Sequence, residues 1–146
     1  MKIIALAILF ILLFRRIKST PDVFKGIVDK KYWENYGKDI VYKYKENLGW
    51  YGESSKAIIS IVMYLIYLFL AVFYLLLGIK INTQIFTILS AVQIFLILCN
   101  IYYTYHIVSI VFDEKFDEIK TNRFSNIINM VLDYIYYLMA IYLLIK

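Results

Sequence analysis

Cysteine, histidine and proline are nearly absent from this chain. Its 146 residues include one cysteine (Cys99), one histidine (His106) and one proline (Pro21). A single cysteine excludes an internal disulfide, a paired-thiol redox centre and a cysteine-based zinc site. A single histidine argues against a protein-only haem or zinc site, so we expect no cofactor. With only five glycines and one proline, the chain also lacks a flexible linker.

Hydrophobic residues are abundant, at 62% of the chain, where a soluble domain has about 45–50%. Three long apolar segments, 57–79, 85–112 and 124–145, reach the ~20 residues that cross a hydrocarbon core. A fourth, 3–14, is short at ~18 Å, but 1–17 reaches ~25 Å if its arginines extend toward the membrane surface. The sequence predicts an all-α integral membrane bundle of four transmembrane helices, the first one short.

The first apolar segment differs from a cleaved signal peptide. A signal peptide has its positive charges before the apolar run and small residues after it. Here one lysine precedes the run, and Arg15, Arg16 and Lys18 follow it. We therefore expect three regions: a retained anchor (1–17), a basic amphipathic region (18–56) and a three-helix transmembrane unit (57–146).

The basic residues are distributed unevenly between the two ends of these segments. Residues 15–56 contain ten Lys and Arg and residues 113–123 contain three, whereas the opposite side has only Lys2, Lys80 and Lys146. Basic loops stay in the cytoplasm. The bias predicts both termini on the non-cytoplasmic side of a prokaryotic plasma membrane or an organelle inner membrane.

The region between the first two apolar segments has two helical patterns. Ser-Thr-Pro-Asp at 19–22 is typical of a helix start, because Ser or Thr can cap and Pro suits the first turn. A second short helix is expected at 38–47, with Gly37 and Gly49 outside it. Aromatic rings among lysines are typical of helices that lie in the membrane interface. A small cytosolic hairpin packed on the helix ends is the alternative.

The predicted contacts of this region are with anionic lipids of the inner leaflet. Its net charge of +4 is too small to favour nucleic acid as a partner. The residues expected at the interface are aromatic or basic: Trp33, Trp50, Lys30, Lys31, Arg15 and Arg16.

Polar and small residues recur every three or four positions along each long apolar segment. Such stripes turn inward, because a polar group facing lipid has no hydrogen-bond partner. The structural interpretation is that they hold the helices together, and the alternative is that they line a path for a solute or ion. The stripes are Ser60, Tyr64, Tyr67, Ala71, Tyr74 and Gly78; Ser90, Gln93, Ile97, Asn100 and Thr104; and Asn126, Asn129, Asp133, Tyr136 and Ala140.

Asp133 is the acidic residue of this pattern. An acid near the centre of a span costs roughly 2.5–3.5 kcal/mol on insertion scales and is a candidate functional residue. From its depth we expect Tyr64, Tyr67 and Asn100 as its partners, within a network that includes Gln93 and Asn129. An alternative places His106 beside Asp133 as a proton relay, although His106 fits better in a shallow aromatic collar.

No catalytic constellation is visible, because HExxH and GxSxG motifs and a second acid within a span are all absent from the sequence. The sequence predicts a non-enzymatic accessory or structural subunit of a larger membrane complex, with other membrane subunits or further copies of itself as partners. The alternative is a homo-oligomeric channel or a proton-linked transport component that uses the polar network around Asp133.

Overall fold

Three helices of this computed structural model are long and apolar enough to cross a membrane. They are α3 (Glu53–Ile81), α4 (Gln84–Phe112) and α5 (Arg123–Ile145). Two more helices, α1 (Lys2–Val28) and α2 (Tyr32–Leu48), precede them. The structure describes residues 2–29, 31–48, 53–113, 115 and 123–146, without the side chains of 40, 41, 43–48, 53–55 and 123. The all-helical prediction is confirmed for the described residues.

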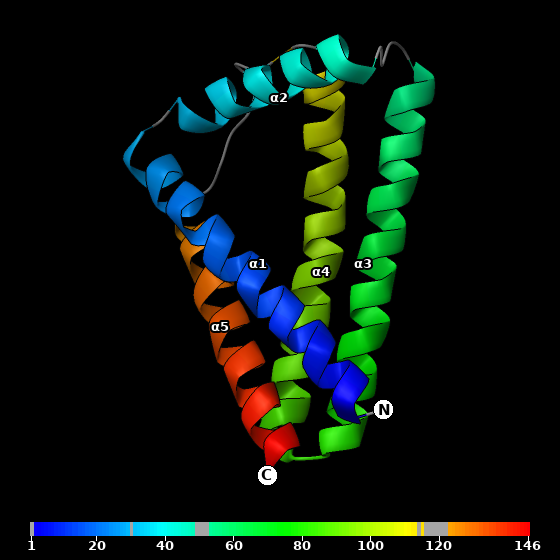
Figure 1. Ribbon diagram of the computed structural model, residues 1–146, viewed down its shortest axis with the longest axis vertical. Helices are drawn as coiled ribbons and strands as arrows, with labels where there is room; N and C mark the ends of the chain where they lie inside the picture. The colour runs from blue at the N-terminus through cyan, green and yellow to red at the C-terminus, as the bar shows by residue number, and fades with distance from the viewer. Residues whose placement is uncertain (1, 30, 49–52, 114, 116–122) are drawn as a thin grey trace.

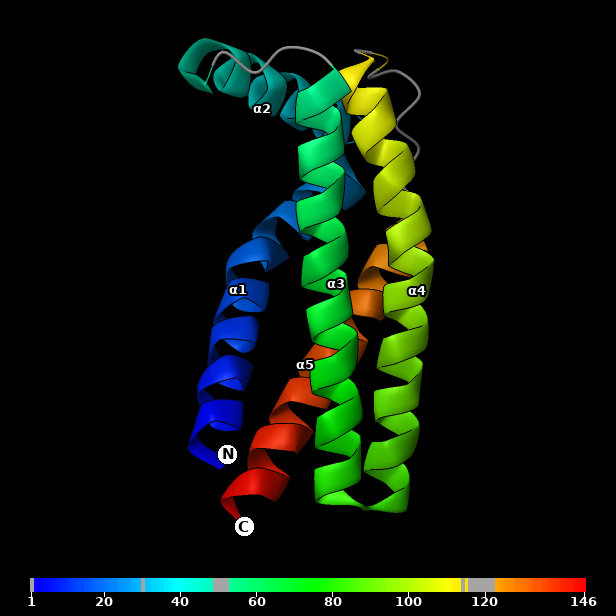
Figure 2. The same ribbon diagram turned by 90° about the vertical axis from the view of Figure 1, so that its right-hand side faces the viewer.

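The helices converge at one end of the molecule and spread at the other. Both termini and the α3–α4 turn lie at the converging end, and α2 crosses the spread end (Figure 1). α1 runs antiparallel to α5, α3 packs along α4, and α2 contacts α1 and α4 (Figure 2). The fold is thus two helix pairs with α2 across one end.

The α3–α4 hairpin turns within two residues. Asn82 adopts a left-handed conformation with φ of 49°, which Asn tolerates better than most residues. Its backbone N–H donates to the Gly78 carbonyl at 3.0 Å. A Cβ at Gly78 would lie 3.1 Å from Ser90 Cβ, so glycine allows α3 and α4 to approach closely. α4 matches the predicted segment 85–112 within one residue, and α3 extends the predicted segment 57–79 by four residues at its start and two at its end.

α1 corrects the expected helix start at 19–22 and leaves the expected count of four spans unconfirmed. It continues for 27 residues through Pro21, so the Ser-Thr-Pro-Asp segment does not begin a new helix. The hydroxyls of Ser19 and Thr20 donate to the Arg16 carbonyl at 3.0 and 2.9 Å. Pro21 lacks the N–H that would bond the Ile17 carbonyl, and these hydroxyl bonds go to the preceding carbonyl, that of Arg16. With its three basic residues between 15 and 18, α1 is not among the three helices that are long and apolar enough to cross a membrane.

α2 begins earlier than the predicted helix at 38–47 and includes Gly37. In the turn before it, Asp29 Oδ1 accepts a hydrogen bond from the Lys31 backbone N–H at 2.9 Å. The Trp33 ring packs on Gly26 of α1, where a Cβ would lie 2.7 Å from Trp33 Cε2. A glycine is therefore needed where α2 folds back against α1.

The buried core lies at the converging end. Leu9, Phe86 and Tyr136 have no exposed surface. The Tyr136 ring lies between Phe86 and Tyr74, at centroid distances of 4.9 and 4.8 Å. By contrast, residues 57–72 of α3 include no buried side chain. The bundle is therefore tightly packed near the termini and open toward α2.

Candidate functional site

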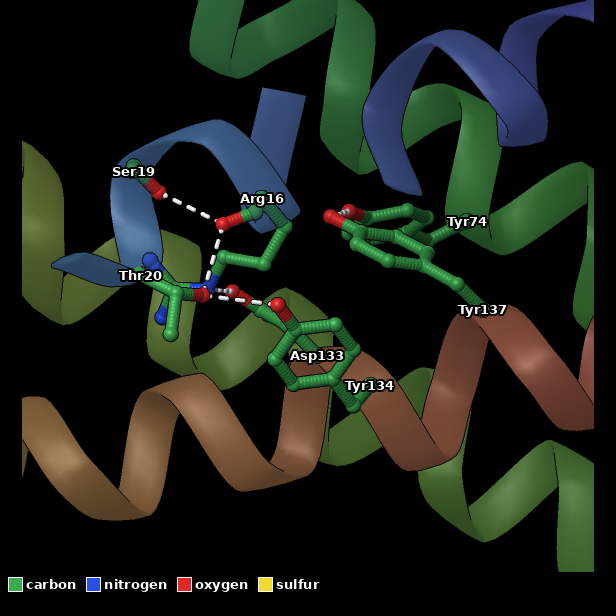
Figure 3. Close-up of polar contacts among 7 residues, drawn as sticks. All are labelled: Arg16, Ser19, Thr20, Tyr74, Asp133, Tyr134 and Tyr137. Carbon is green, nitrogen blue, oxygen red and sulfur yellow. Dashed lines mark hydrogen bonds and ion pairs between the residues drawn. The ribbon is translucent and has the colours of Figure 1, made fainter. Parts of the chain in front are cut away.

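Asp133 on α5 forms an ion pair with Arg16 on α1. The Arg16 Nε atom lies 3.0 Å from Asp133 Oδ2, and the two side chains are 20% and 22% exposed (Figure 3). The Nε–H bond is not directed at a hydrogen-bond acceptor. The contact is therefore electrostatic, a guanidinium beside a carboxylate, with little directional bonding through Nε.

Polar groups of three helices surround this pair. Thr20 Oγ1 and Tyr134 Oη are 2.7 Å apart, which links α1 to α5 a second time (Figure 3). From α4, the buried Gln93 amide lies close to the Asp133 carboxylate. Asp133 thus has a cationic partner on one side and an amide on the other, which is how intramembrane acids are stabilised.

A second group of polar contacts lies toward the core. Tyr74 Oη and Tyr137 Oη are 2.8 Å apart and join α3 to α5. Ser90 Oγ and Tyr136 Oη are 3.2 Å apart and join α4 to α5. Because the hydroxyls pair with each other, these tyrosines place no unpaired polar group in the core.

The expected partners of Asp133 differ from the ones observed. Tyr67 instead bonds Thr104, with 2.8 Å between their hydroxyl oxygens. Tyr64 is exposed, and Asn100 is half-buried. Asn100 lies seven residues beyond Gln93 on α4, or ~10 Å along the helix. The sequence predicts the partners of Asp133 from depth along each helix alone. Depth alone takes no account of the tilt of α5 or of the packing of α1 against it.

Asn129 is half-buried on α5, one helical turn before Asp133. It shares the Asp133 face of α5, as the stripe predicts. Of the predicted network, Gln93 and Asp133 therefore lie close together, and Asn129 lies one turn away from Asp133 on the same helix face.

His106 lies far from Asp133. It is exposed on α4, thirteen residues beyond Gln93, or ~20 Å along the helix. Tyr102 and Tyr105 beside it are also exposed. A direct Asp133–His106 relay does not form in this structure.

The residues predicted at the membrane interface fall in different environments. Arg15 and Lys31 are exposed, and Trp33 is half-buried against Gly26. Arg16, which we expected at the surface, is instead held in the interior by Asp133. Lys30 and Trp50 lie outside the described residues.

Sequence reasoning missed Arg16 as the cation for Asp133. One signal pointed to it, because an acid within a span needs a counter-charge. Among the basic residues, the cluster that directly follows the first apolar segment lies closest to the hydrocarbon. The Thr20–Tyr134 contact had no comparable signal, because both residues are common on helix surfaces.

An open groove of about 620 Å³ lies between α3 and α4 near α2, well away from Asp133. Its lining includes Lys56, whose Nζ donates to Ser109 Oγ at 2.9 Å and lies 3.4 Å from Asp113 Oδ1. Within the described part of the chain, no group of three His, Cys, Asp or Glu residues could hold a metal ion.

No protein-family model, curated protein or solved structure matches this chain. The geometry of the polar contacts is therefore the basis on which a function can be inferred.

Proposed function

We propose that this chain is a non-enzymatic accessory or structural subunit of a larger membrane complex. The observation that supports this proposal most is the pattern of polar contacts. Arg16–Asp133, Tyr74–Tyr137, Ser90–Tyr136 and Tyr67–Thr104 each join a different pair of helices. Polar groups that bond across helices act as connections within the bundle.

The exposed apolar surface of α3 is consistent with a subunit that binds other membrane helices. α3 packs mainly on α4, and large side chains along the rest of α3 are exposed. These include Ile61, Leu65, Leu68, Phe69, Val72 and Leu76. In a membrane, such a surface contacts lipid or the helices of a partner.

A site-specific photocrosslinker distinguishes the two. Placed at Leu65, on the exposed face of α3, it is expected to join the chain to one defined polypeptide in native membranes. Placed at Leu77, which is buried, it is the matched control and should join nothing outside the chain. Crosslinks from Leu65 to lipid alone, with a monomer in gentle detergent, would contradict a subunit role.

A second candidate is a channel or proton-linked transport component. It is supported by the placement of Asp133 next to Gln93, one turn from the Tyr74–Tyr137 hydroxyl pair. Proton flux into liposomes is the assay. If Asp133 carries the proton, Asp133→Asn abolishes flux, whereas unchanged flux would remove Asp133 from that role.

A further inference from the structure

The exposed face of α1 changes character abruptly at residue 15. Ile4, Ile11 and Phe14 are exposed apolar residues. The next exposed residues on this face include Arg15 and Lys18. On this face the apolar surface covers residues 3–14, or ~18 Å, and ends at Arg15, whereas on the adjacent face Ile17, Phe24 and Val28 are still exposed.

The exposed surface of α5, which packs against α1, does not become basic at the level of Arg15. The Arg16–Asp133 ion pair fixes which residues of the two helices lie side by side. Beyond Asp133 toward α2, the exposed residues of α5 include Val131, Ile128 and Phe124. Its apolar face therefore continues for nine residues, or ~14 Å, past the level at which that of α1 has ended.

Two adjacent helices thus differ in where the membrane surface should lie. If the surface followed α5, Arg15 and Lys18 would face hydrocarbon. Neither has an ion-pair partner among the described residues, and an unpaired cation at that depth is strongly disfavoured. The hydrocarbon must instead be thinner beside α1, or an anion must reach these side chains.

We infer that an anionic phospholipid headgroup of the α2-side leaflet binds at Arg15 and Lys18, where the bilayer is locally thinned. Charge and shape agree with a lipid. The basic side chains face the phosphate, and the exposed Ile11 and Phe14 contact its acyl chains. Thinning of a bilayer beside a short apolar segment is the usual response to such a mismatch.

A second copy of the chain fits this surface poorly. Asp133 is the one acid within the three candidate spans that the structure describes, and Arg16 already neutralises it. Asp22, the nearest acid on α1, is 3.7 Å from Lys25 and accepts a hydrogen bond from Tyr32. Two copies meeting through Arg15 and Lys18 would therefore repel each other.

Thiol accessibility tests the depth of this surface. The single native thiol is first removed by Cys99→Ala. Ile17→Cys then places a thiol on α1, and Val131→Cys places one on α5 close to the same level. Both native residues are similarly exposed, at 52% and 46%. Asp39→Cys on α2 reports whether a water-soluble maleimide reaches the α2 side of proteoliposomes.

Maleimides react with the thiolate, which forms in water and not in hydrocarbon. We expect Ile17→Cys to react at least about tenfold faster than Val131→Cys and within about tenfold of Asp39→Cys. Equal protection of the two thiols would overturn the inference, because the membrane would then cover both helices. Equally rapid labelling of both thiols would also overturn the inference, since the membrane surface would then lie at the same level on α1 and α5.

Lipid selectivity tests the occupant. Native mass spectrometry compares retention of phosphatidylglycerol and phosphatidylcholine with identical acyl chains. The unmodified chain should prefer phosphatidylglycerol, and Arg15→Gln/Lys18→Gln should weaken that preference by about fivefold or more. The control Lys80→Gln/Lys146→Gln removes two exposed charges at the other end and should keep it.

Equal retention of both lipids by the unmodified chain would overturn the inference and would instead favour an acidic helix of a partner subunit. An equal loss of preference in both double variants would overturn it as well. Because folding of each variant is followed by circular dichroism, loss of structure is distinguished from loss of the lipid.

Discussion

The Arg16 guanidinium and the Asp133 carboxylate are each unfavourable at membrane depth, and each makes the other tolerable. We expect Arg16→Gln to lower the free energy of unfolding by about 2.5–3.5 kcal/mol, because Asp133 then lacks its counter-charge. Unfolding in detergent micelles by increasing dodecyl sulfate measures this change.

A double variant tests whether the loss comes from the unpaired charge or from lost side-chain packing. Arg16→Met/Asp133→Leu removes both charges and should be close to the parent in stability, since apolar residues can replace a buried ion pair. A double variant whose loss equals the sum of the two single losses would show that the residues act independently.

Gly26 makes a second prediction at the scale of a single residue. A Cβ here would meet Trp33 Nε1 and Cε2, so Gly26→Ala should displace the ring and loosen α2 from α1. Limited proteolysis between the two helices should become faster. Gly37→Ala, a buried glycine within α2, is the control for general helix effects, and equal sensitivity of both variants would contradict a specific contact.

At the scale of elements, the contact between α1 and α2 should depend on pH. Burial and the hydrogen bond to Asp22 raise the pKa of Tyr32 to about 12. The folded state therefore favours the protonated phenol, whose unfolded pKa is about 10. This contribution to stability is complete below pH 10 and is lost as the pH rises from about 10 to 12.

Tryptophan fluorescence in a Trp50→Phe background reports on Trp33 and hence on this contact. The signal should change between pH 10 and about 12, the range set by Tyr32, and Tyr32→Phe should flatten the profile. Tyr42→Phe alters an exposed tyrosine on the same helix and should leave it unchanged. A profile that Tyr32→Phe does not affect would rule out Tyr32 as its source.

The elements themselves were predictable where apolar composition defines them. α4 and α5 begin within one residue of the predicted segments and end at the predicted residues, because long apolar runs have clear limits. The limits of α1 and α2 were wrong. Ser-Thr-Pro-Asp favours a helix start locally, but α1 continues through Pro21 and packs along α5. The sequence pointed to the basic cluster after the first apolar segment as the source of a cation for Asp133, but not to Arg16 within it, since that depends on which face of α1 meets α5.

At the scale of the whole molecule, both termini lie at one end and α2 at the other (Figure 1). Combined with the excess of basic residues near α2, this arrangement predicts that both termini are non-cytoplasmic. Alkaline phosphatase fused after Lys146 should be active, and the same reporter fused after Asp39 should be inactive. The opposite pattern would invert the topology.

The antiparallel α1–α5 pair has a consequence for synthesis of the chain. Thr20 and Tyr134, its bonded neighbours, are 114 residues apart in sequence. At ~5–20 residues per second, a ribosome needs about 6–23 s to supply the second after the first. During that interval Arg16 lacks its partner Asp133. α1, which is made before α5, therefore stays without its ion-pair and hydrogen-bond partners until α5 is made, and a nascent chain that stops before α5 keeps an unpaired arginine.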